Sequence, residues 1–215
     1  MIVETRAVGS FAMNMYVVAC PESRRAAIID SGGELDWAQE VLESYEADVD
    51  FLLQTHSHID HVTELAQAKR RWPSAAVVLH PLDLPIYEGS ANWGERLGIS
   101  IEALPEVDRF VEDGEEIQVG SLNFEVFFTP GHAPGHVCYL ETTKRVIFSG
   151  DLLFEGSIGR TDFPGCSRKD MKKSLVRAMA LDDDFRVLCG HGPETTIGQE
   201  RRSNPFIRGL RSDMD

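Results

Sequence analysis

The segment Thr55-His56-Ser57-His58-Ile59-Asp60-His61 contains three of the chain's seven histidines and one aspartate within six residues. Alternate side chains of an extended segment point the same way, so His56 and His58 can bind one ion together. Asp60 and His61 follow directly and can reach a second ion. Imidazole and carboxylate groups suit zinc, iron or manganese. The alternative is a solvated polar turn, in which the presence of four metal-competent side chains within six residues would be a coincidence. We therefore expect a metal site here.

The bulk composition is that of an ordinary soluble globular protein. The chain has 215 residues, of which 42% are hydrophobic and 26% are charged. A chain of this length can bury a substantial core, and we expect one domain over residues 1–215 without a separate C-terminal helical domain. The N-terminus, residues 1–6, has neither the basic nor the apolar region of a signal peptide. No apolar run approaches the roughly 20 residues that span a bilayer. We expect a cytoplasmic protein.

The formal net charge of −14 argues against nucleic acid or an anionic membrane surface as a partner. An anionic small substrate would need local positive charge, which two metal ions could supply. The cysteines include no C-x-x-C pair, and we expect no disulfide in a cytoplasmic protein. We expect buried positions for three of them and an exposed loop position for Cys166. The four cysteines are Cys20, Cys138, Cys166 and Cys189.

Short strands and helices mix along the chain without strict alternation, which favours two packed sheets with helices outside. The expected strands are Ile2–Arg6, Asn14–Ala19, Ala26–Asp30, Val49–Gln54, Val77–His80, Glu116–Val119, Leu122–Thr129, His136–Glu141, Val146–Ser149 and, last, Arg186–Cys189. Helices are expected over 35–45, from His61 through Lys69, and over Met171–Ala180. The segment from Pro81 to Leu104 contains several prolines and glycines and is expected to be irregular.

Three strands of the second half end at residues that a metal can use. They lead into Pro130-Gly131-His132, Gly150-Asp151 and Gly190-His191-Gly192. A glycine precedes each of these polar residues, as expected where backbone must approach an ion closely. The order strand, loop, metal-competent residue therefore occurs four times, and loops at strand ends can converge on one edge of a sheet.

This set of residues, in this order and spacing, resembles the metallo-β-lactamase superfamily along almost the whole chain. Several stretches are similar to its glyoxalase II-like branch in particular. They are Thr129-Pro130-Gly131-His132-Ala133-Pro134-Gly135-His136, Ser149-Gly150-Asp151-Leu152-Leu153-Phe154, Ser157-Ile158-Gly159-Arg160-Thr161-Asp162-Phe163, Gly190-His191-Gly192-Pro193 and Asn204-Pro205-Phe206.

The resemblance implies an α+β fold, the αββα four-layer sandwich with two mixed sheets inside, and a two-metal site on one edge. By position in the motif, the first metal would be held by His56, His58 and His132. The second would be held by Asp60, His61 and His191, and Asp151 would bridge the two. Two divalent ions are implied, with zinc first and iron or manganese as alternatives.

Two further residues are candidates for contact with a substrate. His136 occupies a position that lies near the metals in the glyoxalase II-like branch, so it would support a ligand or touch substrate. Arg160 would either pair with Asp162 and hold the loop or face a substrate carboxylate. His80 has no motif partner and is interpreted as structural. Residues 82–105 and 154–168 are expected to line the entrance.

The first functional hypothesis is hydrolysis of a thioester such as S-2-hydroxyacylglutathione, with this small-molecule thioester as the expected partner. Two cations would activate a water for attack on the carbonyl, and Asp60 would orient it. No G-x-S-x-G nucleophile motif is present. Glyoxalase II enzymes that bind glutathione have a C-terminal helical domain, whereas only 24 residues (215 − 191) follow His191 here. This weakens the glutathione assignment but not the hydrolase assignment.

The alternative is a mononuclear iron persulfide dioxygenase of the same fold, which shares the Gly-Arg-Thr-Asp-Phe stretch but uses fewer ligands. A binding module that has lost its site is disfavoured by the complete set of metal-competent residues. An RNA-processing nuclease is disfavoured by the acidic charge. Lactonase or β-lactamase activity is a further alternative, because the metal ions do not determine which acyl group is cleaved.

Overall fold

The computed structural model describes residues 1–212, whose strands form two six-stranded sheets and a two-stranded hairpin. The first sheet consists, in spatial order, of β1 (Ile2–Val8), β2 (Met13–Cys20), β3 (Arg25–Ile29), β4 (Asp48–Leu53), β5 (Ala76–Leu79) and β6 (Arg109–Phe110). The second consists of β14 (Thr195–Thr196), β13 (Arg186–Cys189), β10 (Val146–Gly150), β9 (Val137–Glu141), β8 (Leu122–Phe128) and β7 (Glu116–Val119). The hairpin is β11 (Leu153–Phe154) with β12 (Ser157–Ile158).

Both sheets are mixed. In the first, β1, β2 and β3 pair antiparallel, and the pairs from β3 to β6 are parallel. In the second, β10 and β13 are parallel and the other neighbours are antiparallel. The helices are α1 (Leu35–Ser44), α2 (Ile59–Val62), α3 (Leu65–Arg71), α4 (Leu84–Leu97), α5 (Arg168–Ala178), α6 (Ile197–Ser203) and α7 (Pro205–Ser212), with a 3-10 turn at Pro81–Asp83.

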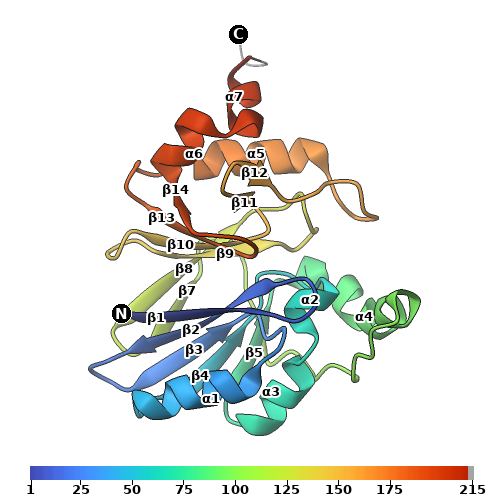
Figure 1. Ribbon diagram of the computed structural model, residues 1–215, viewed down its shortest axis with the longest axis vertical. Helices are drawn as coiled ribbons and strands as arrows, with labels where there is room; N and C mark the ends of the chain where they lie inside the picture. Colours follow the sequence, from blue (N-terminus) through green and yellow to red (C-terminus); the bar gives the residue numbers. More distant parts are fainter. Residues whose placement is uncertain (213–215) are drawn as a thin grey trace.

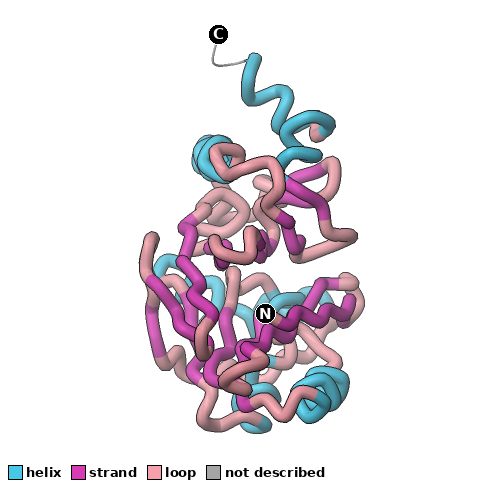
Figure 2. Tube along the Cα trace, turned by 90° about the vertical axis from the view of Figure 1, so that its left-hand side faces the viewer, coloured by secondary structure: helices cyan, strands magenta, loops and turns pink. Residues whose placement is uncertain are grey.

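The sheets face one another, with α1 and α3 outside the first sheet and α5, α6 and α7 outside the second (Figures 1 and 2). This arrangement has three apolar layers. One lies between the first sheet and its helices, one between the sheets, and one between the second sheet and its helices. The expected α+β fold, a four-layer αββα sandwich, is confirmed.

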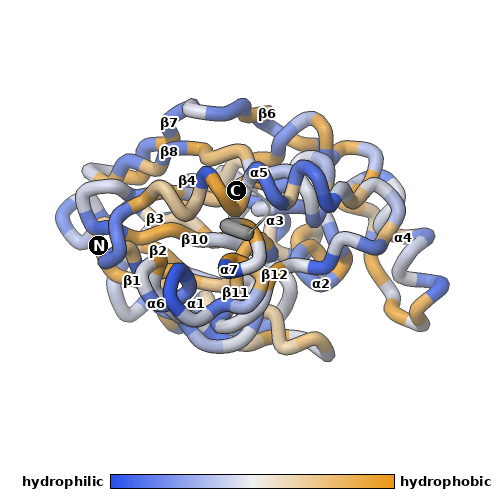
Figure 3. Tube along the Cα trace, turned by 90° about the horizontal axis from the view of Figure 1, so that it is seen from above, coloured by the Kyte–Doolittle hydropathy of each residue, from blue (hydrophilic) through white to orange (hydrophobic). Residues whose placement is uncertain are grey.

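Strand β2 shows how the sequence produces this layering. Met15 and Val17 point into the layer beneath α1 and α3, whereas Tyr16 and Val18 point into the layer between the sheets. Since successive side chains of a strand face opposite ways, a strand covered on both faces must be apolar throughout. The hydrophobic residues accordingly follow β2 and β3, while strongly hydrophilic residues occur on the outer helices (Figure 3).

The prediction that the segment from Pro81 to Leu104 is irregular is wrong, because α4 occupies Leu84–Leu97. Pro85 lies in the first turn, where proline's missing N–H costs nothing. Gly98 ends the helix in the left-handed conformation at φ 71°. Gly94 lies where helix and following chain touch, since a Cβ there would come within 2.6 Å of the Ile99 carbonyl oxygen. These residues, read as breakers, therefore cap and pack a helix.

Two other boundaries also differ from expectation. Arg186–Cys189 is not the last strand, because β14 pairs with it and α6 and α7 follow. The helix expected from His61 begins two residues earlier as α2 and is interrupted before α3. A two-residue strand has too few residues to show a periodicity, so β14 left no signal in the sequence. Among residues 1–212, no helix is both long and apolar enough to cross a membrane.

Candidate metal centre

The seven metal-competent residues lie together at one edge of the sandwich. His56, His58, Asp60 and His61 follow β4 of the first sheet, and α2, which begins within this run, lies at the sheet edge in Figure 1. The other three follow strands of the second sheet: His132 follows β8, Asp151 follows β10 and His191 follows β13. An isolated bridge between Met13 and His191 joins the two sheets at this edge. The expected convergence of strand ends is confirmed.

The donor atoms fall into two groups that share the region around Asp151. Three nitrogens, from His56, His58 and His132, lie within 4.8 Å of one another, and so do donors of Asp60, His61 and His191. Asp151 Oδ2 is 3.4 Å from His132 Nε2, while its Oδ1 is 3.4 Å from His61 Nε2. One carboxylate therefore faces both groups, one oxygen to each.

Backbone carbonyls fix the orientation of two of the rings. Nδ1 of His132 lies 2.9 Å from the Arg160 carbonyl oxygen, and Nδ1 of His191 lies 3.1 Å from that of Phe11. A carbonyl can only accept a hydrogen bond, so each Nδ1 donates. In the neutral ring this leaves the Nε2 lone pair free and directed into the centre, as metal binding requires.

Buried Asp30 fixes two more rings from behind. It accepts a hydrogen bond from His61 Nδ1 at 2.9 Å and from the Thr55 hydroxyl at 2.8 Å. Because Thr55 donates its only proton to Asp30, its oxygen must accept from His56 Nδ1, 3.0 Å away. His58 presents Nδ1, which lies 2.8 Å from His132 Nε2. Five ring nitrogens thus point at the same small volume.

Buried polar atoms without a protein partner test whether the site fits metal ions. His56 Nε2, His61 Nε2 and Asp151 Oδ1 are buried and lack any hydrogen-bond partner among the described residues. A buried polar atom that loses water without a replacement costs about 1–3 kcal/mol. All three atoms belong to the donor set, and divalent cations bound there would satisfy them. The residues therefore fit metal ions.

The protonation equilibria favour the metal-binding forms of most donors. Burial, followed by the neighbouring histidines, lowers the pKa of His56 well below its ordinary value and that of His58 to about 3. Asp151 has a pKa below its ordinary value, because nearby histidines outweigh the opposing effect of burial. The pKa of His61 lies well above its ordinary value: burial lowers it, but the carboxylates of Asp30, Asp60 and Asp151 raise it by more. The pKa of His191 is raised too, because Asp60 and Asp151 outweigh the opposing effect of burial. A cation would replace the proton on each of these rings as the counter-charge.

Glycine is required where backbone passes the donors. A Cβ on Gly190 would overlap Asp151 Oδ1, and a Cβ on Gly159 would overlap the Asp151 carbonyl oxygen and approach the His132 ring at 3.2 Å. Both positions need space rather than an unusual backbone angle. The glycine before His191, noted in the sequence, thus permits the close approach expected there.

The remaining candidates lie behind or beside the donors. His136 is fully buried, its Nε2 accepts the Asp151 N–H at 3.0 Å, and its Nδ1 lies 2.8 Å from the Thr129 hydroxyl. Both nitrogens are engaged inside the protein, so His136 holds the backbone of Asp151. Arg160 pairs with Asp162 at 2.7 and 2.8 Å, as expected for one of its two predicted roles.

His80 lies outside the donor set, where it stacks on Phe128 with ring centroids 4.3 Å apart. Cys166 is partly buried and donates to the His132 carbonyl oxygen. Asp30 and Asp83 were not predicted as site residues. The only signal at Asp30 is its place directly after β3, and no local pattern marks Asp83, which accepts from Ser57 N–H at 2.5 Å and Gly135 N–H at 2.9 Å.

Known proteins match this chain over nearly its full length. The family model of the metallo-beta-lactamase superfamily matches residues 9–191. The hydroxyacylglutathione hydrolase GloC of Haemophilus influenzae is 36% identical, with 96% of this chain and 98% of GloC covered.

Two solved structures are also similar. TTHA1623 in a di-iron-bound form has a TM-score of 0.86 and 38% identity, with 96% of this chain and 100% of that chain covered. The BLEG-1 B3 metallo-beta-lactamase has a TM-score of 0.88 and 33% identity, with 96% and 99% covered. Together with the fold and the donor set, these matches show that the chain belongs to the metallo-beta-lactamase superfamily of metal-dependent hydrolases.

Proposed function

We propose that this protein is a binuclear metal-dependent hydrolase that cleaves thioesters of the S-2-hydroxyacylglutathione class. The observation that carries the proposal is the pair of donor groups on either side of Asp151. His56, His58 and His132 would hold one ion, Asp60, His61 and His191 the other, and Asp151 both. Zinc, iron and manganese all accept such a donor set, and the relative TTHA1623 was solved with two irons.

Two divalent cations held there would lower the pKa of a water to near neutrality and polarise the thioester carbonyl. The chain itself supplies position and charge. Asp60 Oδ2 is 3.1 Å from His191 Nε2, which leaves the other carboxylate oxygen to accept a proton from the attacking water. Asp30 and His136 are positioning residues, because they hold His61 and Asp151 in place without reaching a substrate.

The match to GloC supports the thioester assignment. That relative is named a hydroxyacylglutathione hydrolase, and the aligned region covers 98% of its length. The need for a further helical domain, which weakened the glutathione assignment, is therefore not general among proteins of that name. The second donor group also favours the hydrolase over a mononuclear iron persulfide dioxygenase, which would use fewer of these residues.

Thiol release from S-D-lactoylglutathione by the metal-replete protein tests the proposal. His132→Ala should lower kcat/KM by more than about a hundredfold, because even residues that only support a metal ligand contribute about 10–100-fold. His80→Gln is the matched control, since this histidine lies outside the donor set. Absence of thiol release would contradict the proposal. Oxygen consumption with glutathione persulfide and hydrolysis of a β-lactam would then test the other two activities.

A further inference from the structure

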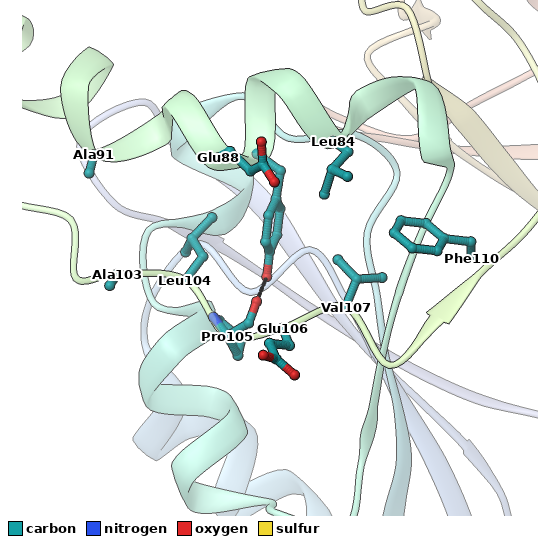
Figure 4. A pocket seen from close by; sticks show the side chains of 10 residues that line it. Leu84, Glu88, Ala91, Ala103, Leu104, Pro105, Glu106, Val107 and Phe110 are labelled. Atoms are coloured by element: carbon teal, nitrogen blue, oxygen red, sulfur yellow. Dashed lines mark hydrogen bonds between the residues drawn. The ribbon is translucent and has the colours of Figure 1, made fainter.

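Two cavities in the described part of the chain differ in their relation to the donors, and the smaller one includes a metal-competent residue. The larger, about 440 Å³, is bounded by α4 and residues 103–110, and its largely apolar wall is shown in Figure 4. None of the seven donors lines it. The smaller, about 200 Å³, has Asp60 in its wall. We name it the Asp60 cavity.

The walls of the Asp60 cavity come from two glycine-containing turns, from α2 with the two residues that follow it, and from Ile99 after α4. Gly9 to Phe11 follow β1, and Gly32 to Glu34 follow β3. A Cβ on Gly32 would overlap the Asp60 carbonyl oxygen, so glycine lets this turn approach α2. The carbonyl of Phe11 accepts the hydrogen bond from His191 Nδ1. The cavity is therefore built against the donor group of Asp60, His61 and His191.

The cavity is acidic. Glu34 and Glu64 line it together with Asp60, and no lysine or arginine is among its lining residues. Arg6 forms an ion pair with Glu34 at 3.7 Å. Because both side chains are about half exposed, solvent weakens this pair. Carboxylates repel an incoming carboxylate and accept hydrogen bonds from hydroxyl groups. A small neutral group with a hydroxyl fits this lining.

The opposite side of the centre has a different character. The ring of Phe163 lies 5.9 Å from that of His58 and 6.5 Å from that of Trp93, and both Phe163 and Trp93 are about 40% exposed. Arginine side chains lie over both rings: Arg160 is 3.7 Å from the Phe163 centroid and Arg96 is 5.5 Å from that of Trp93. An anionic carrier such as a small acidic peptide thiol meets Arg96 and Arg160 here, the latter partly neutralised by Asp162. In the Asp60 cavity it would meet carboxylates only.

We propose that the Asp60 cavity receives the acyl group of the thioester, and that Glu34 and Glu64 select short uncharged acyl groups over those that end in a carboxylate. The thiol carrier lies on the side of Phe163 and Trp93. This inference rests on the proposed function. In hydrolysis, water adds to the carbonyl carbon, the C–S bond breaks, and the hydroxy acid and the protonated thiol leave.

The test compares kcat/KM for S-butanoylglutathione and S-succinylglutathione, whose acyl chains have the same length and differ in terminal charge. The wild-type protein should prefer the butanoyl thioester. Glu34→Gln with Glu64→Gln should raise the succinyl-to-butanoyl ratio by about tenfold, as expected for removing two charges near the added carboxylate. Glu88→Gln with Glu106→Gln is the control, since these residues line the larger cavity and change the net charge equally.

The inference would be overturned if Glu34→Gln with Glu64→Gln left the succinyl-to-butanoyl ratio of kcat/KM unchanged. It would also be overturned if Glu88→Gln with Glu106→Gln changed that ratio equally. Ser10→Trp gives a second measurement that does not depend on charge, because Ser10 also lines the cavity. It should lower kcat/KM for S-butanoylglutathione more than for S-acetylglutathione, and an equal effect on both would count against the cavity. If the wild-type protein hydrolyses no thioester, the proposed function fails too. If it hydrolyses S-D-lactoylglutathione but the ratio does not respond, only the assignment of the cavity fails.

Discussion

At the scale of single residues, the candidate donors could be identified from the sequence, whereas the orientation of their side chains could not. Each donor follows a predicted strand, and a glycine precedes three of them, so local pattern is enough to find them. The groups that orient the rings lie far away along the chain: His191 is fixed by the carbonyl of Phe11, 180 residues earlier. A carbonyl contact of this kind depends on the fold rather than on residue type, so no sequence pattern marks it.

Asp83 provides a prediction at this scale, because it joins the two loops that carry the first donor group. Its side chain is fully buried and its oxygens accept from Ser57 N–H and Gly135 N–H. Asp83→Asn replaces one acceptor with an amide NH2 that faces a backbone donor. We expect a loss of about 10–100-fold in metal affinity and in kcat/KM, measured by metal titration and thiol release.

Glu88→Gln, an exposed acid-to-amide change on α4, is the control for Asp83→Asn. It should leave metal affinity and kcat/KM unchanged. Full metal affinity and activity in Asp83→Asn would show that the two loops keep their positions without this carboxylate, and would contradict its role in joining them.

At the scale of elements, long periodic segments were predictable, whereas short elements and a helix bounded by proline and glycine were not. The helix expected over Met171–Ala180 is present as α5, capped by Ser167, whose hydroxyl accepts the Asp170 N–H. In contrast, the prolines and glycines around α4 act as caps and contacts, roles that depend on what packs against the helix. The C-terminal helices were missed although α6 has a local N-cap, Thr196, whose hydroxyl accepts the Gln199 N–H. Their contacts with the hairpin β11–β12, such as Asn204 Nδ2 donating to the Ser157 carbonyl oxygen, depend on the fold.

Glu200 on α6 provides a prediction for these contacts. Its buried carboxylate accepts from the Thr195 hydroxyl at 2.6 Å, and from Gly156 N–H and Asn204 Nδ2 at 2.8 Å each. It thereby ties α6 to β14 and to the turn between β11 and β12. Glu200→Ala leaves these donors without an acceptor, so the free energy of unfolding in urea should fall by about 3 kcal/mol.

The exposed neighbour Gln199 offers the control for this measurement. Gln199→Ala should change the free energy of unfolding by less than about 0.5 kcal/mol, as surface substitutions usually do. A Glu200→Ala protein as stable as Gln199→Ala would mean that water replaces the carboxylate at no cost, and that α6 is held by its apolar contacts alone.

At the scale of the whole molecule, the centre depends on both sheets at once. The first donor group takes His56 and His58 from the first sheet and His132 from the second. The second group is divided in the same way, with Asp60 and His61 from one sheet and His191 from the other. Metal binding therefore joins two halves of the chain that otherwise meet through the apolar layer between the sheets. The order of residues along the chain was enough to predict the candidate donors. The three apolar layers could not be predicted in this way, because each depends on which face of every strand its side chains occupy.

The number of metal ions bound per chain tests the central claim most directly. Elemental analysis of the purified, metal-reconstituted protein should give two divalent ions per chain. His191→Ala, which removes a donor of the second group only, should retain the first ion and lower the count to about one. A count of one in the wild-type protein, with no further loss in His191→Ala, would contradict the binuclear account and favour a mononuclear centre formed by His56, His58 and His132.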